Sequence, residues 1–279
     1  MSIFFVVFFF ILGLFFGSFL NLIADRLSRG EKITGRSYCE NCKKILSWKD
    51  LIPLLSFVWL RGKCRYCHSP LTFQYLFSEL LTGFLFSLTF LYVFSVGIFN
   101  FQFSIFNEIL NQKSLIINLL YYFFIVSSMV VIFFSDLRHG IIPDKIVFPA
   151  IIASLLFLTI STFYLPPSEI LPSTLNHLLS GFGSFLFFLF LFLITKGKGM
   201  GFGDVKLSFL IGLILGLPGT IYSIYLAFLT GGVFAIILIL WKKNKLKSQV
   251  PFGPFLVGNF FLVLFFQPQI NRIILNLIR

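Results

Sequence analysis

Two aspartates are the residues of this sequence best placed to perform chemistry together. Asp136 ends a long apolar run and Asp204 begins another, in a chain that has only ten acidic residues. Two carboxylates that lie close together cannot both ionise, so one keeps a proton while the other acts as a base and activates water for attack on an amide. The pair therefore predicts an aspartyl peptidase that needs neither a metal nor a nucleophilic side chain.

Each aspartate could instead cap a helix or pair with a nearby cation, Arg138 or Lys206. An ionisable group at a helix end within hydrocarbon is costly, which favours a functional role. We therefore predict that Asp136 and Asp204 are catalytic. Asp144 is a competitor, but it stands at the start of an expected helix, where the helix dipole favours an acidic cap.

Glycines and prolines near the aspartates are the predicted substrate contacts. Gly201 and Gly203 precede Asp204, where the absence of a side chain would let a substrate strand approach the backbone. Irregular backbone at membrane depth is tolerated only where it is buried in protein or lines a wet cavity. We therefore expect the approach to the last apolar run to line the cleft as well, through Pro251, Gly253 and Pro254. The alternative is that proline simply suits a first helical turn there.

The four cysteines of the chain form a second site. Cys39, Cys42, Cys64 and Cys67 make two C-x2-C pairs that 21 residues separate. Paired knuckles of this kind suit tetrahedral zinc, and four thiolates leave no open coordination position. We predict structural zinc rather than a disulfide or redox pair, because the loop is expected to face a reducing cytoplasm. His68 would be a fifth ligand for four places and is expected to be a bystander.

A membrane-embedded scaffold must position these sites. The chain is 58% hydrophobic and 11% charged, against about 25% charged residues in soluble domains. A span needs roughly 20 apolar residues, so the sequence predicts an all-α polytopic membrane protein with about eight transmembrane helices. The expected spans are 3–24, 76–98, 115–135, 145–164, 176–195, 205–217, 220–241 and 252–271. The first is a span rather than a secretory signal, because no Lys or Arg precedes Arg26.

Positive charge predicts the orientation and the domains. Nineteen of the 22 Lys and Arg residues fall on one side of this topology, which marks that side as cytoplasmic and leaves both termini outside. We expect a first transmembrane helix at 1–24, a cytoplasmic zinc loop at 25–75 and a membrane-embedded peptidase core at 76–279. Because this topology accounts for the net charge of +12, no nucleic-acid partner is expected.

The chain resembles the type IV prepilin peptidases, membrane aspartyl proteases with a G-x-G-D motif. The resemblance covers nearly the whole chain and rests on motifs in a shared order: Gly17–Asn21 with Arg26, Asp50–Ser56, Arg61–Cys67, Glu79–Gly83, Asp136 with Ile142–Asp144, Gly201–Leu207 and Pro251–Phe255. Two departures lie in the cysteine loop. Glu40 follows the first cysteine where the family often has proline, and Leu51 stands where it often has asparagine.

This resemblance implies cleavage of the basic leader of prepilins and pseudopilins at the cytoplasmic face of a bacterial inner membrane, with Asp136 and Asp204 as the catalytic pair. It also implies N-methylation of the new N-terminus from S-adenosylmethionine, since members with the cysteine loop usually have both activities. Glu79 and Asn21 are candidates for the methyl-donor site, although interfacial anchoring is the expected role of each.

Two rival classes remain open. A transporter could use intramembrane carboxylates for proton coupling, but the acidic groups lie at the membrane edge and no paired broken helices occur in matching halves. A non-catalytic scaffold built on the zinc loop would tolerate loss of both aspartates.

Overall fold

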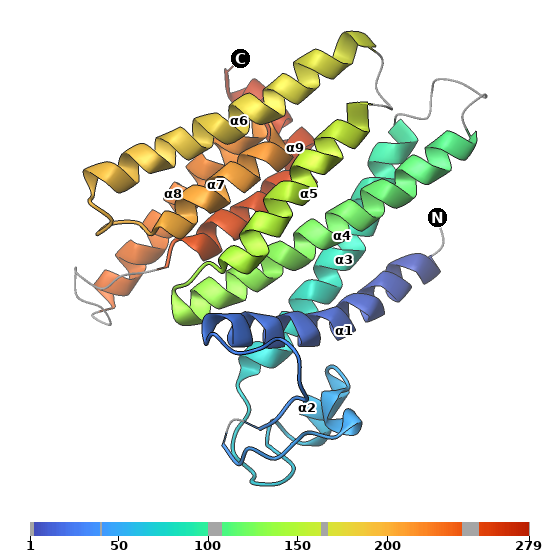
Figure 1. Cartoon of the computed structure of the whole chain (residues 1–279), viewed down its shortest axis with the longest axis vertical. Coiled ribbons are helices and arrows are strands. Elements are labelled where there is room, and N and C mark those ends of the chain that lie inside the picture. The colour runs from blue at the N-terminus through green and yellow to red at the C-terminus, as the bar shows by residue number, and fades with distance from the viewer. Residues whose placement is uncertain (1–2, 40, 100–107, 163–166, 242–250, 279) are drawn as a thin grey trace. The chain divides into compact units, whose positions relative to one another are not determined.

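Helices make up almost all of the regular structure. The structure, a computed structural model, describes residues 3–39, 41–99, 108–162, 167–241 and 251–278. Its long helices are α1 (Ile3–Ser28), α3 (Phe73–Phe99), α4 (Glu108–His139), α5 (Asp144–Thr162), α6 (Pro167–Ile194), α7 (Phe202–Leu215), α8 (Gly219–Leu240) and α9 (Gly253–Ile278) (Figure 1). Short segments η1 (Trp48–Leu51) and α2 (Leu55–Trp59) lie in the loop between α1 and α3. The all-α prediction is confirmed for these residues, in which extended pairing is limited to two isolated bridges.

Seven of these helices are long and apolar enough to cross a membrane. The sixth predicted span, 205–217, corresponds to α7, which has only 14 residues. At about 1.5 Å per residue α7 is roughly 21 Å long, whereas the hydrocarbon core of a bilayer is about 30 Å thick. The prediction of about eight transmembrane helices is therefore confirmed for seven of them, whereas the shortest predicted span ends at Gly216, before it can cross.

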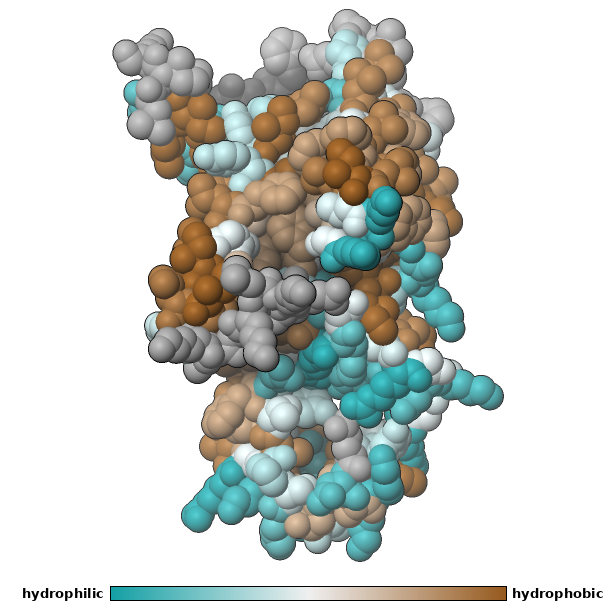
Figure 2. Space-filling view, turned by 90° about the vertical axis from the view of Figure 1, so that its left-hand side faces the viewer, coloured by the Kyte–Doolittle hydropathy of each residue, from teal (hydrophilic) through white to brown (hydrophobic). Residues whose placement is uncertain are grey.

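The outer surface of the helices is apolar. Only 11% of the apolar stretch of α8 and 17% of that of α1 are buried inside the protein. Figure 2 shows hydrophobic side chains over the helices and hydrophilic side chains gathered over the loop between α1 and α3. A bilayer removes this apolar surface from water, so the chain is a multi-pass membrane protein.

Two compact units, Met1–Phe134 and Ser135–Arg279, divide the chain. In the first unit, α1 and α3 pack backbone to backbone. A Cβ atom at Gly13 would lie 2.7 Å from the Cα of Gly83, and one at Gly17 would lie 2.8 Å from the Cα of Glu79. Small residues four apart permit such close crossing between membrane helices. The three-part domain division expected from the sequence stays a prediction.

The second unit is built around α7, which contacts α5, α6, α8 and α9. The helices α6 and α7 are antiparallel, since Phe192 contacts Phe202 at one end and Asn176 donates to the Leu217 carbonyl at the other. Gly212 lets them touch, because a Cβ atom there would lie 2.5 Å from the Cα of Gly181. This central position buries α7 almost completely and fixes where its first turn points.

Candidate active site and metal centre

Asp136 and Asp204 come together at one end of the second unit. Asp136 lies in the last turn of α4, and Asp204 lies in the first turn of α7. The two residues are only 5% and 7% exposed, and the charge of Asp136 acts on Asp204. The structure thus brings together two carboxylates that are 68 positions apart in the sequence, in surroundings where both cannot easily ionise.

The start of α9 packs directly against Asp136. The backbone N–H of Gly253, the first residue of α9, is directed at this carboxylate. A Cβ atom at position 253 would lie 2.5 Å from Asp136 Oδ2, which is buried and has no hydrogen-bond partner among the described residues. Because a helix N-terminus carries partial positive charge, α9 favours the ionised form of Asp136.

The two glycines before Asp204 have packing roles of their own. The Gly201 N–H donates to Asp204 Oδ2 at 3.3 Å, which ties the carboxylate to the start of its own helix. A Cβ atom at Gly203 would lie 2.9 Å from the Cβ of Ile142, in the connection between α4 and α5. Gly203 therefore allows α7 to begin close to the end of α4. Their contact with substrate stays a prediction.

Lys206 pairs with Asp144 rather than with Asp204. Asp144 is the first residue of α5, as expected of a helix cap, and its carboxylate accepts from the Lys206 ammonium group. The same ammonium lies 5.5 Å from the ring centroid of Phe148 and 5.4 Å from that of Phe202. Lys206 and Asp144 therefore form an ion pair with each other, and neither belongs to the pair of Asp136 and Asp204.

The segment from Pro251 to Pro254 becomes helical at Gly253, although we expected irregular backbone there. Residue Gly253 begins α9, and the buried Pro254 stands in its first turn, in agreement with the first-turn alternative. Of the segment, Gly253 contacts Asp136, whereas Pro251 precedes the helix and is half-buried. Contact of the segment with substrate stays a prediction. Four of the nineteen basic residues assigned to the cytoplasmic side lie outside the described residues, namely Lys242, Lys243, Lys245 and Lys247.

The four cysteines converge in the loop of the first unit. Their sulfur atoms all lie within 4.8 Å of one another, and Cys39 Sγ lies 3.8 Å from Cys67 Sγ. Four sulfurs placed tetrahedrally at about 2.3 Å from a zinc ion would be about 3.8 Å apart. All four are free thiols, and His68 is not part of the cluster. The four cysteines are therefore positioned to bind a metal ion.

The two cysteine pairs adopt the same turn. The carbonyl of the first cysteine in each pair accepts from the N–H four residues later, Lys43 in one and His68 in the other. Both of these residues have φ of 57°, and an isolated bridge closes each turn. This repeat gives His68 a backbone role in place of a ligand role, as a residue that completes the knuckle.

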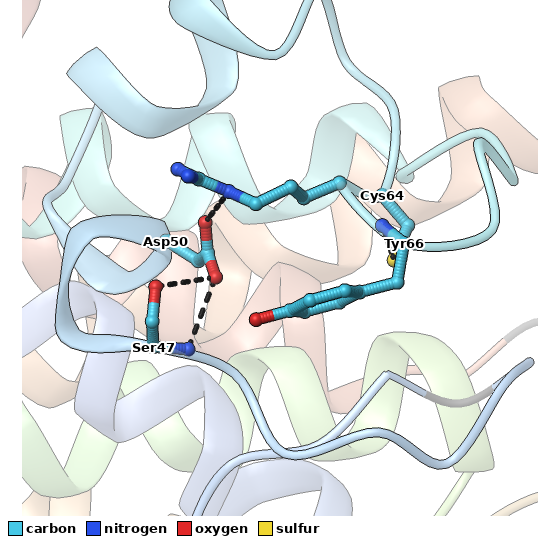
Figure 3. Close-up of polar contacts among 5 residues, drawn as sticks. Ser47, Asp50, Cys64 and Tyr66 are labelled. Atoms are coloured by element: carbon cyan, nitrogen blue, oxygen red, sulfur yellow. Dashed lines mark hydrogen bonds and ion pairs between the residues drawn. The ribbon is translucent and has the colours of Figure 1, made fainter.

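A buried carboxylate supports the second knuckle. Asp50 Oδ1 accepts from Arg65 Nε at 2.7 Å, and its Oδ2 accepts from the Ser47 hydroxyl at 2.7 Å and the Ser47 N–H at 3.0 Å (Figure 3). Burial alone would raise the pKa of Asp50, but the Ser47 hydrogen bonds and the Arg65 guanidinium lower it. The carboxylate thus stays ionised and ties the 47–50 segment to the turn between Cys64 and Cys67.

Hydrogen bonds also prepare the thiols for metal binding. The Ser69 hydroxyl and N–H lower the pKa of Cys67 to about 6, and the Cys42 N–H lowers that of Cys39. Although the Lys44 N–H lowers it, the pKa of Cys42 rises to about 11 through desolvation and the neighbouring thiols. Thiolates crowded together in this way favour a bound cation, whose charge offsets their repulsion.

Comparison with known proteins gives the family. The chain matches the Bacterial Peptidase A24 N-terminal domain over residues 11–93 and the Type IV leader peptidase family over residues 123–236. The "Prepilin leader peptidase/N-methyltransferase" of Klebsiella pneumoniae is 31% identical over 224 residues, which cover 77% of this chain and 88% of that protein. The protein of the same name from Xanthomonas campestris pv. campestris is 30% identical over 269 residues, 88% of this chain and 85% of that protein.

The chain belongs to the type IV leader peptidase family. The resemblance seen in the sequence is confirmed, and the chain is an enzyme, a membrane-embedded peptidase. A relative of the same name from Myxococcus xanthus is 47% identical over 83 residues, and this chain covers only 25% of its length. No solved structure matches the chain.

Glu79 has a partner that the sequence did not reveal. Glu79 is buried on α3, where its Oε2 accepts from the Leu54 N–H at 2.8 Å. Leu54 has φ of 60° and stands directly before α2, so Glu79 holds the cysteine loop at a point between its two cysteine pairs. The interfacial anchoring expected of Glu79 stays a prediction. The other candidate, Asn21, is fully buried on α1, with both amide atoms unpartnered among the described residues.

Arg26 has a structural role that the sequence motif alone did not predict. Its guanidinium donates to the carbonyls of Ile33, Gly35 and Arg36, and the residue is 7% exposed. The signal in the sequence was a basic residue just after the apolar run 3–24, in what proves to be the last turn of α1. Arg26 fixes the chain as it leaves α1 and enters the cysteine loop.

Proposed function

We propose that this chain is a membrane aspartyl endopeptidase that cleaves the leader peptide of type IV prepilins and pseudopilins. The observation that carries the proposal is the burial of Asp136 and Asp204 side by side at helix ends. The relatives' shared name, prepilin leader peptidase/N-methyltransferase, supports the substrate class. A proton-coupled transporter receives no support from these relatives.

The aspartate pair performs the cleavage. One carboxyl group keeps its proton and donates it to the scissile carbonyl oxygen, while the other accepts a proton from the attacking water. The amide nitrogen then leaves with a proton, and the two carboxyl groups exchange roles. We assign the base to Asp136, because the N-terminus of α9 faces it and its Oδ2 atom has no competing partner among the described residues.

The active site faces the cytoplasm in this proposal. Four basic residues flank the helix ends that carry the aspartates: Arg138, Lys145, Lys196 and Lys198. Positive charge marks cytoplasmic loops. A prepilin has a basic leader before an apolar helix, so its scissile bond reaches this boundary while the helix remains in the bilayer.

The chain also N-methylates the amine that cleavage exposes. S-adenosylmethionine supplies an electrophilic methyl group: the amine lone pair forms the N–C bond, the C–S bond breaks with its electrons passing to sulfur, and the amine proton goes to solvent. Zinc at the four cysteines is structural, because four thiolates fill its coordination shell.

Incubation of the purified enzyme with a prepilin, followed by mass measurement of the product, tests both reactions. Loss of the leader supports the peptidase, and a further gain of one methyl group on the new N-terminus supports the methyltransferase. An intact substrate with wild-type enzyme would refute the peptidase assignment. A cleaved product that stays unmethylated when S-adenosylmethionine is present would refute only the second activity.

A further inference from the structure

A cavity in the first unit lies between α1, α3 and the cysteine loop. Its volume is about 350 Å³, within the range of roughly 300–1,000 Å³ that is typical of ligand pockets. It is built from elements that the sequence separates, the end of α1, the loop and the start of α3. The peptidase chemistry uses none of its residues, since both aspartates belong to the second unit.

The lining of this cavity combines three kinds of side chain. Carboxyl groups line it at Asp25, Glu31, Asp50 and Glu79, and guanidinium groups line it at Arg26, Arg29 and Arg65. Arg26 donates to backbone carbonyls, Arg65 pairs with Asp50, and Arg29 is exposed. Aromatic rings are contributed by Tyr38, Phe57 and Tyr75. A ligand that suits this lining has a positive centre for the carboxylates, a carboxylate for an arginine and a flat ring for the aromatic side chains.

Glu79 retains the capacity to bind a ligand. One of its oxygens accepts from the Leu54 N–H, and the Ser18 hydroxyl gives it a second hydrogen bond. An ionised carboxylate offers about four acceptor sites, so roughly two remain. A buried carboxylate is expensive without a cation nearby, and a positively charged ligand would supply that charge.

We propose that this cavity binds S-adenosylmethionine, with Glu79 facing the sulfonium group. The proposal rests on the N-methylation proposed above and adds the site for its methyl donor. The sulfonium is the positive centre, the methionine carboxylate meets Arg29, and adenine lies among the aromatic rings. The charged and aromatic side chains of the lining therefore match the three parts of the cofactor.

A tryptophan introduced into the cavity tests its location. Leu76 lines the cavity, whereas Leu80 lies one helical turn further along α3 and is 40% exposed outside it. We expect Leu76→Trp to weaken binding of S-adenosylmethionine to the full-length enzyme in detergent by at least about tenfold, because the indole occupies ligand space. Leu80→Trp, the matched control, should bind like the wild type. Equilibrium dialysis with labelled cofactor measures both.

The charge of Glu79 is tested separately with two probes. Glu79→Gln keeps an oxygen that can accept from Leu54 but removes the negative charge. It should weaken binding of S-adenosylmethionine about fivefold to tenfold and that of neutral S-adenosylhomocysteine less than about twofold, because only the first is cationic. If zinc content and thermal unfolding show that Leu76→Trp does not fold, Glu79→Gln alone still tests whether S-adenosylmethionine binds in this cavity.

Three outcomes would overturn the proposal. Wild-type affinity in a folded Leu76→Trp enzyme would place the cofactor elsewhere, and equal weakening of both probes by Glu79→Gln would remove the carboxylate–sulfonium contact. Absence of binding to the wild type would refute the site. The mass of the cleaved prepilin tests the proposed N-methylation independently of the proposed site. A methylated product shows that the enzyme is a methyltransferase even if its methyl donor does not bind in this cavity.

Discussion

At the scale of single residues, the two aspartates differ in what holds them. Asp204 is tied to the start of its own helix by the Gly201 N–H, whereas Asp136 faces the N-terminus of a different helix, α9. A pair in unequal surroundings divides the roles of acid and base more readily than a symmetric one. The proposed mechanism depends on this difference.

Removal of either carboxylate should abolish cleavage. We expect Asp136→Asn and Asp204→Asn each to lower the rate of prepilin cleavage by at least about 1,000-fold, because the pair acts as a unit and the loss of one member removes the function of both. Cleavage is followed by the mass shift of the substrate.

Asp144→Asn is the control for this pair, since its partner is Lys206 and it lies outside the aspartate pair. We expect a loss of less than about tenfold, in keeping with a cap or surface ion pair. Substantial turnover in either Asp136→Asn or Asp204→Asn, with the protein inserted in the membrane, would contradict the catalytic assignment.

Gly253 should tolerate no side chain. Gly253→Ala places a methyl group 2.5 Å from Asp136 Oδ2, so the carboxylate or the start of α9 must move, and we expect cleavage to fall by about 10- to 100-fold. Gly258→Ala lies on the same helix with nothing within 4 Å of its new methyl group and should cleave normally. Steady-state kinetics compare the two, and equal activities would show that the contact is dispensable.

At the scale of elements, α7 is too short to span but central to its unit. It is buried by α5, α6, α8 and α9, and its position sets where Asp204 lies. Contacts between small residues, such as that of Gly212 with Gly181, hold it against α6. Since membrane helices associate mainly through close packing, a gap at this crossing would loosen the catalytic end.

A side chain at position 212 should destabilise this crossing. We expect Gly212→Ala to reduce the free energy of unfolding by about 1–3 kcal/mol, because a methyl group cannot fit against the α6 backbone. Gly183→Ala, on α6 itself, meets nothing within 4 Å and should be neutral or slightly stabilising. Thermal unfolding in detergent compares them, and a Gly212→Ala enzyme as stable as Gly183→Ala would show that the crossing is less tight than described.

At the scale of the whole molecule, the two proposed activities belong to different units. The cysteine loop and the cavity lie within Met1–Phe134, and the aspartates lie within Ser135–Arg279. Zinc bound at the four cysteines is expected to supply folding energy to the loop, whereas the proposed aspartate mechanism needs no metal. The two activities should therefore respond differently to removal of the metal.

Chelation should separate the activities. The purified enzyme is expected to contain about one zinc ion per chain, bound by four thiolates. Strong chelation should expose the four thiols to labelling and lower methylation much more than cleavage. Elemental analysis, thiol counts and product masses measure the three effects. A metal content near zero in an enzyme whose thiols all react would rule out the zinc site, and parallel loss of both activities would contradict their separation.

The apolar runs of the sequence are too long and too many for a soluble fold, so they are enough to predict a membrane protein, and the ordered motifs are enough to predict the family. The sequence also singled out Asp136, Asp204 and the four cysteines, since rare charged residues and paired C-x2-C knuckles stand out by type and spacing. What it could not determine depends on distances between segments that are far apart in the chain. The shortness of α7, the Lys206–Asp144 pair, the contact of Gly253 with Asp136 and the cavity beside Glu79 each arise from packing. Side-chain reach and backbone approach across helices decide such contacts, and only the tertiary structure supplies them.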